Sequence, residues 1–285
     1  MSMDKAKLVV IKGAGDLASG IALRLVHAGF SPVMTEVRAP TAVRRTVCFS
    51  EAVYNGRARV EEVTAVLVRT IDEIDEIDAM SACMARKEIA LFVDEKAEIV
   101  RRINPAAVVD AIMAKRNTGT KITDAKTVVG VGPGFTAGDD CHAVVETSRG
   151  HTLGRVIYEG GAIPNTGIPG NIGGYTIERL LRTNASGIFT ARKRIGDFVH
   201  RGEVVAETVP EHNLGVPVPI TAAIDGILRG ILPSGIPVPQ GMKAGDIDPR
   251  CEKDHCFTVS DKALAVAGGV LEALLHFGFN TKNHG

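Results

Sequence analysis

The sequence contains no tryptophan and few aromatic residues of any kind. Among its 285 residues, Phe, Trp and Tyr together make up 4%. Proteins that bind single-stranded nucleic acid stack bases on aromatic side chains, so this composition argues against such a partner. Lys plus Arg and Asp plus Glu are both 33, so the chain also lacks the broad basic field of a nucleic-acid-binding protein. The sequence therefore predicts no nucleic-acid partner.

Long hydrophobic runs are also absent. No uncharged apolar stretch reaches the roughly 20 residues that a membrane-spanning helix needs. The first apolar segment is interrupted by Lys12 and runs into glycines, unlike a secretory signal. The five cysteines are odd in number and widely spaced, which does not suit a disulfide framework. We therefore expect a cytoplasmic protein with free thiols and no membrane partner.

The first half of the chain alternates between strand and helix patterns. Strand patterns occur at 7–12, 31–37, 63–68, 89–94, 107–114 and 126–131. Helical spacing occurs between them at 17–29, 49–56, 72–87 and 95–103. Regular alternation is typical of a parallel sheet with helices on both faces. Residues 1–142 are therefore predicted to form a Rossmann-like, doubly wound domain of the α/β class that binds a nucleotide or cofactor.

The pattern changes near residue 143. Short alternating apolar runs are then separated by glycine, Asp-Gly and proline turn signals, which predicts a β-rich domain over 143–250. The remaining segment, 251–285, is predicted to hold a helix that begins after Ser260 as its N-cap and ends near Phe277. Leucines at 264, 271 and 275 share one face of that helix.

The segment VVIKGAGDLASG carries a glycine loop between the first strand and the first helix. Gly13, Gly15 and Ala18 fit the relaxed dinucleotide fingerprint, in which a pyrophosphate approaches the backbone at the second glycine. Glu36 ends the second strand about 20 residues on, where an acidic side chain binds ribose hydroxyls. The loop therefore predicts a nucleotide or dinucleotide site. The alternatives are a purely structural turn and a site for another anion.

Two charged residues leave further alternatives open. Asp16 would face a pyrophosphate, so it either caps the helix or holds a cation against the ligand. Arg38 follows Glu36 closely, together with Arg44 and Arg45. These arginines either meet a 2′-phosphate or an acidic substrate, or they form a solvated surface.

A second glycine loop, GVGPGFTAGDD at 130–140, follows the last predicted parallel strand. Gly132 and Gly134 should lie at the same carboxyl edge of the sheet as the first loop, which favours a ligand cleft there. The catalytic residues are unknown. The candidates near this edge are Lys115, Asp140 and Cys141, and Cys141 either acts as a thiolate or packs beneath the loop.

The β-rich half contains two short segments with the same residue spacing. GDFVHRG, from Gly196, and GIPVPQG, from Gly235, share their Gly, Val and Gly spacing. Such doubled strand-turn-strand units resemble the barrel-sandwich fold of biotinyl and lipoyl carrier domains. Carrier domains present a lysine on the connection between the units, but residues 209–219 contain none. We therefore predict the fold without its swinging-arm function.

Cys251, His255 and Cys256 form a C-x3-H-C cluster. Structural zinc sites normally take four ligands in recognisable pairs, and this cluster falls short of that pattern. We therefore predict no metal site.

Longer segments carry a family resemblance. They are KGAGDLASGIALRL, VMTEVRAPTAVRRTVCFSEAVYNG, VGVGPGFTAGDDCHAVVETSRGHTLGRVI, NTGIPGNIGGYTIERLLR and VSDKALAVAGGVLEALL. In these segments the chain resembles the accessory proteins of selenium-dependent molybdenum hydroxylase systems. The first domain of those proteins is similar to that of xanthine dehydrogenase maturation factors.

The resemblance implies a role in maturing a molybdenum hydroxylase, which would be the protein partner. The implied cofactors are NAD(P) or a molybdopterin dinucleotide, since both carry a pyrophosphate. The alternatives are an NAD(P)-dependent oxidoreductase and a non-catalytic scaffold that docks the hydroxylase. A homo-oligomer is possible in each case.

Overall fold

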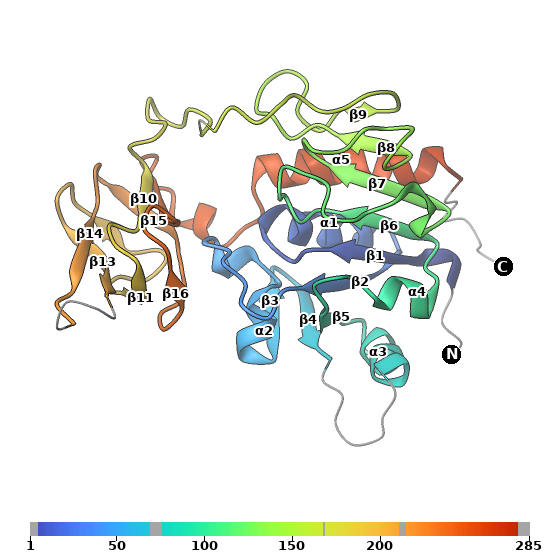
Figure 1. Ribbon diagram of the computed structural model, residues 1–285, viewed down its shortest axis with the longest axis horizontal. Coiled ribbons are helices and arrows are strands. Elements are labelled where there is room, and N and C mark those ends of the chain that lie inside the picture. The colour runs from blue at the N-terminus through green and yellow to red at the C-terminus, as the bar shows by residue number, and fades with distance from the viewer. Residues whose placement is uncertain (1–4, 69–75, 168, 211–214, 279–285) are drawn as a thin grey trace. The chain divides into compact units, whose positions relative to one another are not determined.

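The computed structural model describes residues 5–68, 76–167, 169–210 and 215–278. The chain forms two compact units, which we describe separately. Unit 1 comprises the residues up to Pro40, then 48–166, and those from Val259 onward. Unit 2 comprises 41–47 and 167–258. The molecule is a mixed α/β protein (Figure 1).

A nine-stranded sheet forms the centre of unit 1, in the order β3-β4-β5-β2-β1-β6-β7-β8-β9. Its strands are β1 (Leu8–Lys12), β2 (Ser31–Glu36), β3 (Arg57–Val60), β4 (Val63–Leu67), β5 (Ile89–Val93), β6 (Ala107–Asp110), β7 (Thr127–Val131), β8 (Ala143–Val145) and β9 (Val156–Ile157). The strands from β4 to β8 pair in parallel, and only the outer strands β3 and β9 pair antiparallel to their neighbours. All five residues of β1 are buried, as expected for a central parallel strand that is covered on both faces.

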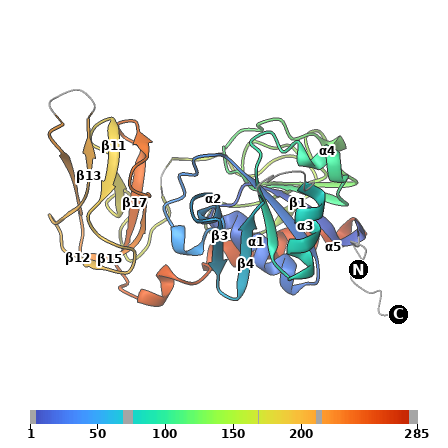
Figure 2. The ribbon, with the colours of Figure 1, turned by 90° about the horizontal axis from the view of Figure 1, so that it is seen from below.

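Helices cover both faces of this sheet. The α-helices of the described residues are α1 (Asp16–His27), α2 (Glu51–Asn55), α3 (Glu76–Ala85), α4 (Ile99–Ile103) and α5 (Asp261–His276). Helices α1 and α5 pack against each other on one face, and α4 lies on the other (Figures 1 and 2). Side chains of α3 and α4 share one hydrophobic cluster with alternate strand residues such as Leu8 and Val10. Short 3₁₀ segments are η1 (Lys5–Lys7), η2 (Arg45–Val47), η3 (Ile122–Asp124) and η4 (Lys253–Cys256).

Glycines allow α5 to pack closely. A Cβ at Gly20 of α1 would lie 2.8 Å from the Cβ of Ala263, so the two helices approach nearly to backbone contact. Further along α5, a Cβ at Gly269 would lie 2.2 Å from the carbonyl oxygen of Gly154. Gly154 in turn has a φ of +81°, and its own Cβ would lie 2.5 Å from the carbonyl oxygen of Ala265. This pair of glycines therefore fixes the loop before β9 against the helix.

Helix α5 confirms its predicted start. The hydroxyl of Ser260 accepts a hydrogen bond from the amide of Ala263, which is the expected N-cap interaction. The buried face, however, is lined by small and branched residues, while Leu264 and Leu275 are exposed. The leucine spacing identified the helix but not the face that packs.

Some strands differ from the sequence prediction. The strand expected over 107–114 ends at Asp110, and Met113 and Lys115 then adopt positive φ angles. Strand β3 was not predicted. The parallel sheet continues into β8, which belongs to the region expected to be antiparallel. Part of the predicted helix at 72–87 lies outside the described residues.

Unit 2 consists of two four-stranded antiparallel sheets with a shared hydrophobic core. One sheet has the order β10-β17-β15-β12 and the other β14-β13-β11-β16. The strands are β10 (Leu180–Arg182), β11 (Gly187–Ala191), β12 (Phe198–Val199), β13 (Val204–Val209), β14 (Val218–Thr221), β15 (Gly226–Ile231), β16 (Pro237–Val238) and β17 (Lys243–Asp248). Both β12 and β16 fall inside the two similar glycine segments; β12 pairs with β15 in the first sheet, and β16 pairs with β11 in the second.

The boundaries between the two units differ from the predicted domain boundaries at 142/143 and 250/251. The boundary expected at 142/143 falls inside the large sheet, because β8 pairs directly with β7. The C-terminal helix belongs to unit 1, and 41–47 belongs to unit 2. Over the stretches of chain given above, none of the helices is both long and apolar enough to cross a bilayer.

Candidate functional site

The first glycine loop joins β1 to α1. Gly13 has a φ of +93°, and a Cβ there would lie 3.1 Å from the carbonyl oxygen of Ala111 and from the Cα of Ile112. The backbone that follows β6 therefore approaches this position too closely for a side chain. Gly13 is therefore explained by its positive φ and by the packing of the sheet edge alone.

Gly15 has a different environment. Its φ of −73° suits any residue, and a Cβ there would have no other atom within 4 Å. Gly15 is the N-cap of α1, and its own position supplies no side-chain cap. Neither backbone strain nor packing accounts for a glycine here. The space above it stays open to a ligand that approaches the start of the helix.

Asp16 and Ala18 lie in the first turn of α1. The structure makes Gly15 the N-cap, so the interpretation of Asp16 as the capping residue is wrong. Asp16 still contributes a negative charge to the first turn, where it interacts favourably with the helix dipole. Ala18 is fully buried, which fits the small third residue that lets helix and strand pack closely.

Glu36 ends β2 beside the loop. One carboxylate oxygen accepts a hydrogen bond from the amide of Ala14 at 2.9 Å, and the other accepts from the amide of Val37 at 2.8 Å. Burial raises the pKa of this carboxyl, and the two backbone hydrogen bonds partly offset that effect. A carboxylate offers about four acceptor positions, so acceptor capacity remains for hydroxyl groups of a ligand.

The three arginines after Glu36 separate in the structure. Arg38 is exposed just beyond β2. Arg44 belongs to unit 2, where its buried guanidinium donates to the carbonyl oxygens of His255 and Thr258. Arg45 also belongs to unit 2, in η2. Only Arg38 shares a compact unit with the first glycine loop.

The second glycine loop is packed by the protein itself. A Cβ at Gly132 would lie 2.8 Å from the hydroxyl of Thr147, and one at Gly134 would lie 2.6 Å from the backbone nitrogen of Arg116. Gly130 lies directly beneath the ring of Phe135. These glycines therefore accommodate neighbouring protein atoms, and their presence does not require a ligand.

The three catalytic candidates lie in different environments in the structure. Lys115 is exposed and has a φ of +61°. The carboxylate of Asp140 accepts from the side-chain amide of Asn117 at 2.8 Å and from the amide of Thr136 at 2.9 Å, which ties two loops together. Cys141 is fully buried, and burial raises the pKa of its thiol to about 11. The interpretation of Cys141 as packing beneath the loop fits this environment, since a reactive cysteine needs a lowered pKa.

A polar network at the same sheet edge was missed by the sequence analysis. The ammonium of Lys12 donates to the hydroxyl of Thr120 at 2.9 Å and lies 3.4 Å from a carboxylate oxygen of Asp124. The Thr120 hydroxyl donates in turn to Asp110 at 2.5 Å. Burial raises the pKa of Asp110, and the hydrogen bond from Thr120 partly offsets the rise. The sequence signal that could have revealed this network is a charged residue at the last position of two buried strands, Lys12 in β1 and Asp110 in β6.

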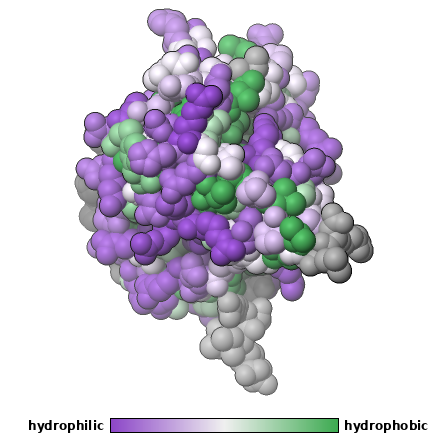
Figure 3. Space-filling view, turned by 90° about the vertical axis from the view of Figure 1, so that its left-hand side faces the viewer, coloured by the Kyte–Doolittle hydropathy of each residue, from purple (hydrophilic) through white to green (hydrophobic). Residues whose placement is uncertain are grey.

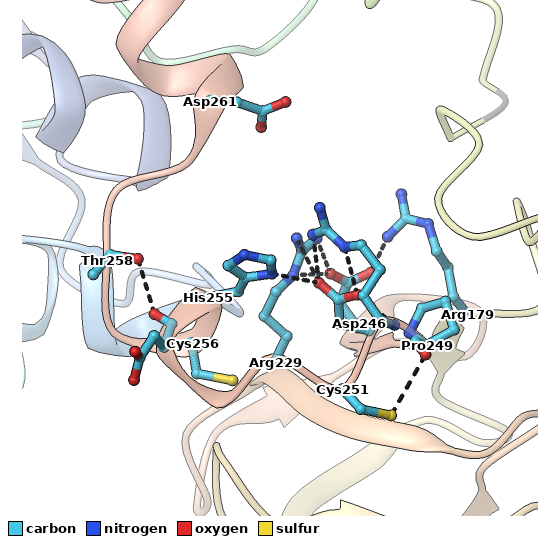
Figure 4. A network of polar contacts seen from close by, with 12 residues as sticks. Arg179, Arg229, Asp246, Pro249, Cys251, His255, Cys256, Thr258 and Asp261 are labelled. Carbon is cyan, nitrogen blue, oxygen red and sulfur yellow. Dashed lines mark hydrogen bonds and ion pairs between the residues drawn. The ribbon is translucent and has the colours of Figure 1, made fainter.

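The C-x3-H-C cluster does not converge. Cys251 is exposed and donates toward the carbonyl oxygen of Pro249, while Cys256 is buried. Figure 4 shows the two sulfur atoms pointing away from His255. Within the described parts of the chain, no group of three or more His, Cys, Asp or Glu residues is arranged to hold a metal ion.

The same region of unit 2 contains a buried ion-pair network instead (Figure 4). Asp246 bonds to both Arg179 and Arg229, and all three side chains are at least nine-tenths buried. Asp248 lies 3.4 Å from Arg229 and accepts from Arg250 at 2.6 Å. Each buried charge on β15 and β17 therefore has an oppositely charged partner within the network.

The surface gives little additional guidance. Figure 3 shows one face of the molecule, on which hydrophobic residues occur in small groups separated by hydrophilic ones. This distribution is ordinary for exposed protein surface. The best-defined candidate site is therefore the edge of the large sheet at the first glycine loop.

Comparison with known proteins gives one relative with close sequence similarity. The chain is 48% identical over 269 residues to "Uncharacterized protein YqeB" of Escherichia coli (strain K12). The match covers 94% of this chain but only 47% of the relative, so the chain spans about half of that protein's length. No family model matches the sequence.

Solved structures give only remote likenesses. An aspartoacylase family protein from Mesorhizobium loti is 13% identical with a TM-score of 0.27, over 85% of this chain and 84% of that one. The ectoine utilization protein EutE (DoeB) from Ruegeria pomeroyi, with product bound, is 11% identical with a TM-score of 0.25, over 85% and 57%. A succinylglutamate desuccinylase/aspartoacylase from Rhodobacter sphaeroides is 18% identical with a TM-score of 0.23, over 25% and 21%. Such scores carry no argument about the reaction of this chain.

These comparisons correct the family resemblance drawn from the sequence. The solved structures that match belong to aspartoacylase-like and ectoine utilization proteins, and the curated relative is uncharacterised. None of them is named as an accessory protein of a molybdenum hydroxylase. The expected molybdenum cofactor maturation, the selenium chemistry and the hydroxylase-docking scaffold are therefore set aside. The oxidoreductase alternative also finds no counterpart among these proteins.

Proposed function

We propose that unit 1 binds a dinucleotide of the NAD(P) type at the loop between β1 and α1. Gly15 carries the proposal. It stands at the start of a 12-residue helix, its backbone suits any residue, and the space beside its Cα is empty. A glycine that the protein does not itself need is expected where a pyrophosphate comes close to the backbone. The proposal concerns binding and names no reaction.

The order of the strands supports this position. Strand β1 lies between β2 and β6, and the chain winds away from it in both directions. Open α/β sheets bind ligands outside the carboxyl ends of the strands at such a switch point. We infer from this order that unit 1 is a Rossmann-like domain. The edge strands β3 and β9 are additions to that plan.

Glu36 favours NAD over NADP in this proposal. Its carboxylate lies against the loop through the amide of Ala14, close to where an adenosine ribose would lie. A carboxylate there accepts hydrogen bonds from ribose hydroxyls and repels a 2′-phosphate. Arg38 is exposed nearby and would favour the opposite choice, so the ratio of the two affinities reports which side chain dominates.

For unit 2, we infer a barrel-sandwich fold. Two strand-turn-strand units exchange their short middle strands, since β12 pairs with β15 and β16 pairs with β11. The connection of 209–219 lacks the lysine that carrier domains modify. A structural or docking role suits such a domain better than a swinging arm.

Calorimetric titration of the full chain with NAD and with NADP tests the proposal. At a ligand concentration a hundredfold above the dissociation constant, unit 1 should gain about 2.7 kcal/mol of stability. Gly15→Val should abolish dinucleotide binding while the fold survives, because the new side chain would occupy the place of the pyrophosphate. Gly268→Val is the matched control, since a Cβ there also has no atom within 4 Å. Equal binding by wild type and Gly15→Val would refute the assignment of the loop.

A further inference from the structure

A second site in unit 1 is a cavity of about 310 Å³. Its charged residues come from three segments that are distant in the sequence. Lys12 is the last residue of β1, Lys96 and Arg101 follow β5, and Lys121 follows β6. The cavity therefore lies at the carboxyl edge of the sheet. Its volume is at the lower end of the range for small-molecule sites.

The cavity lies on the face of the sheet opposite to α1. Side chains alternate along a strand, so Lys12 faces the same way as Leu8 and Val10. Those two residues pack in the cluster that includes side chains of α3 and α4. The dinucleotide site proposed above is at the start of α1, on the other face. The two sites share no lining residue.

Lys12 is the fixed cation of this cavity. Its side chain is 9% exposed, and its ammonium contacts Thr120 and Asp124. A protonated lysine has three N–H donors, so one donor remains for a ligand in the cavity that Lys12 lines. The hydrogen bond to Thr120 holds the ammonium in place, because that hydroxyl is itself bonded to buried Asp110.

The charges around the cavity favour a dianion. Four cationic side chains line it, against the two carboxylates of Glu98 and Asp124. Asp110, which accepts the hydrogen bond of the Thr120 hydroxyl, offsets part of that excess positive charge. A phosphate monoester carries a charge of about −1.5 to −2 at neutral pH. Three of the four cations are lysines, which bind phosphate as point charges, and the fourth, Arg101, can offer paired donors to phosphate oxygens.

We propose that this cavity binds a phosphate group, either as free phosphate or as the terminal phosphate of a small metabolite. Lys12 supplies the buried anchor, and Lys96, Arg101 and Lys121 close around the anion from the cavity walls. The proposal does not depend on dinucleotide binding, because the lining residues are different.

The test uses inorganic phosphate as the probe and the full chain in phosphate-free buffer, with calorimetry as the measurement. Lys96→Gln and Lys121→Gln each remove one exposed lining charge, so the fold should be retained. Each should weaken phosphate affinity roughly 15- to 30-fold, as expected for a unit charge about 4 Å from a charge of −1.5 to −2 in water-like surroundings. Lys126→Gln is the matched control, since Lys126 is exposed and does not line the cavity. It should bind phosphate as the wild type does.

Several outcomes would overturn the proposal. They are no saturable binding of phosphate by the wild type, an equal loss of affinity in Lys126→Gln, and tighter binding of malonate than of phosphate. Titration of Gly15→Val separates the two sites. If the dinucleotide proposal alone is correct, this variant loses NAD binding and the wild type binds no phosphate. If the phosphate proposal alone is correct, both proteins bind phosphate and neither binds NAD.

Discussion

Two adjacent glycines in α5 should respond in opposite directions to the same substitution. Gly268 and Gly269 both lie in the interior of the helix, where alanine is favoured over glycine by about 1 kcal/mol. A Cβ at Gly268 meets no atom within 4 Å, so Gly268→Ala should raise the free energy of unfolding by up to about 1 kcal/mol. The new methyl group at this position costs nothing in packing.

Gly269→Ala should destabilise the protein despite the same gain in helix propensity. Its Cβ would lie 2.2 Å from the carbonyl oxygen of Gly154 and 2.8 Å from a methyl carbon of Val145. The first atom belongs to the backbone, so the loop must move away from the helix. Overpacking of this kind typically costs about 1–3 kcal/mol. The gain in helix propensity is common to both variants, so they should differ by roughly 1–3 kcal/mol, with Gly269→Ala the less stable.

Urea unfolding followed by far-ultraviolet circular dichroism measures this difference, since the chain has no tryptophan for fluorescence. The comparison should use the transition midpoint and slope of each variant together, because a changed slope would signal a different unfolded state. Equal midpoints for the two variants, or a more stable Gly269→Ala, would refute the close approach of α5 to the loop at Gly154.

Three further predictions concern the labelling of cysteines, unfolding by acid and covalent modification of unit 2. A thiol reagent at pH 8 should label one cysteine per native chain, because only Cys251 is exposed and burial raises the pKa of Cys141 to about 11; Cys251→Ser should abolish native labelling, and labelling of Cys141 would contradict the buried site. Burial raises the pKa of Asp248, but its hydrogen bonds from Arg250 and the charge of Arg229 outweigh that effect and hold the pKa below its usual value. Its stabilising contribution is therefore present above about pH 4 and lost as the pH falls through the lowered pKa, so acid unfolding of Asp248→Asn should depend less on pH than that of the wild type. Intact mass of the protein from its native host should show no lipoyl or biotinyl group, since residues 209–219 contain no lysine; an added mass of that kind on any lysine of unit 2 would refute this.

The sequence was informative wherever a local rule decides the structure. The run at 8–12 is apolar until Lys12 and forms the central strand of the sheet, and Ser260 caps its helix as expected. The same rules misjudged 107–114, because an apolar pattern continues after Asp110 while the backbone turns there. The Asp110 carboxylate accepts a hydrogen bond from the amide of Ile112, and Met113 has a φ of +63°.

Long-range contacts could not be predicted from the sequence. Gly132 and Gly15 look equivalent in the chain, but Thr147 packs against the first and no protein atom against the second. Arg44 follows Glu36 by eight positions, yet its partners are more than 200 residues further on. The family resemblance failed in a similar way, since it assigned a role from segment likeness that the matched proteins do not support.

The division of the chain into two units has a consequence for its synthesis. Residues 41–47 are synthesised before 48–166 of unit 1 but belong to unit 2, most of which follows residue 166. Val43 then accepts a hydrogen bond from the amide of Ile231, so this short piece must await its partner strand. Unit 1 in turn is completed only by α5, which is made after all of unit 2. Neither unit can therefore be excised by a single cut, and a nascent chain that stalls before residue 259 would leave the α5-binding face of the large sheet uncovered.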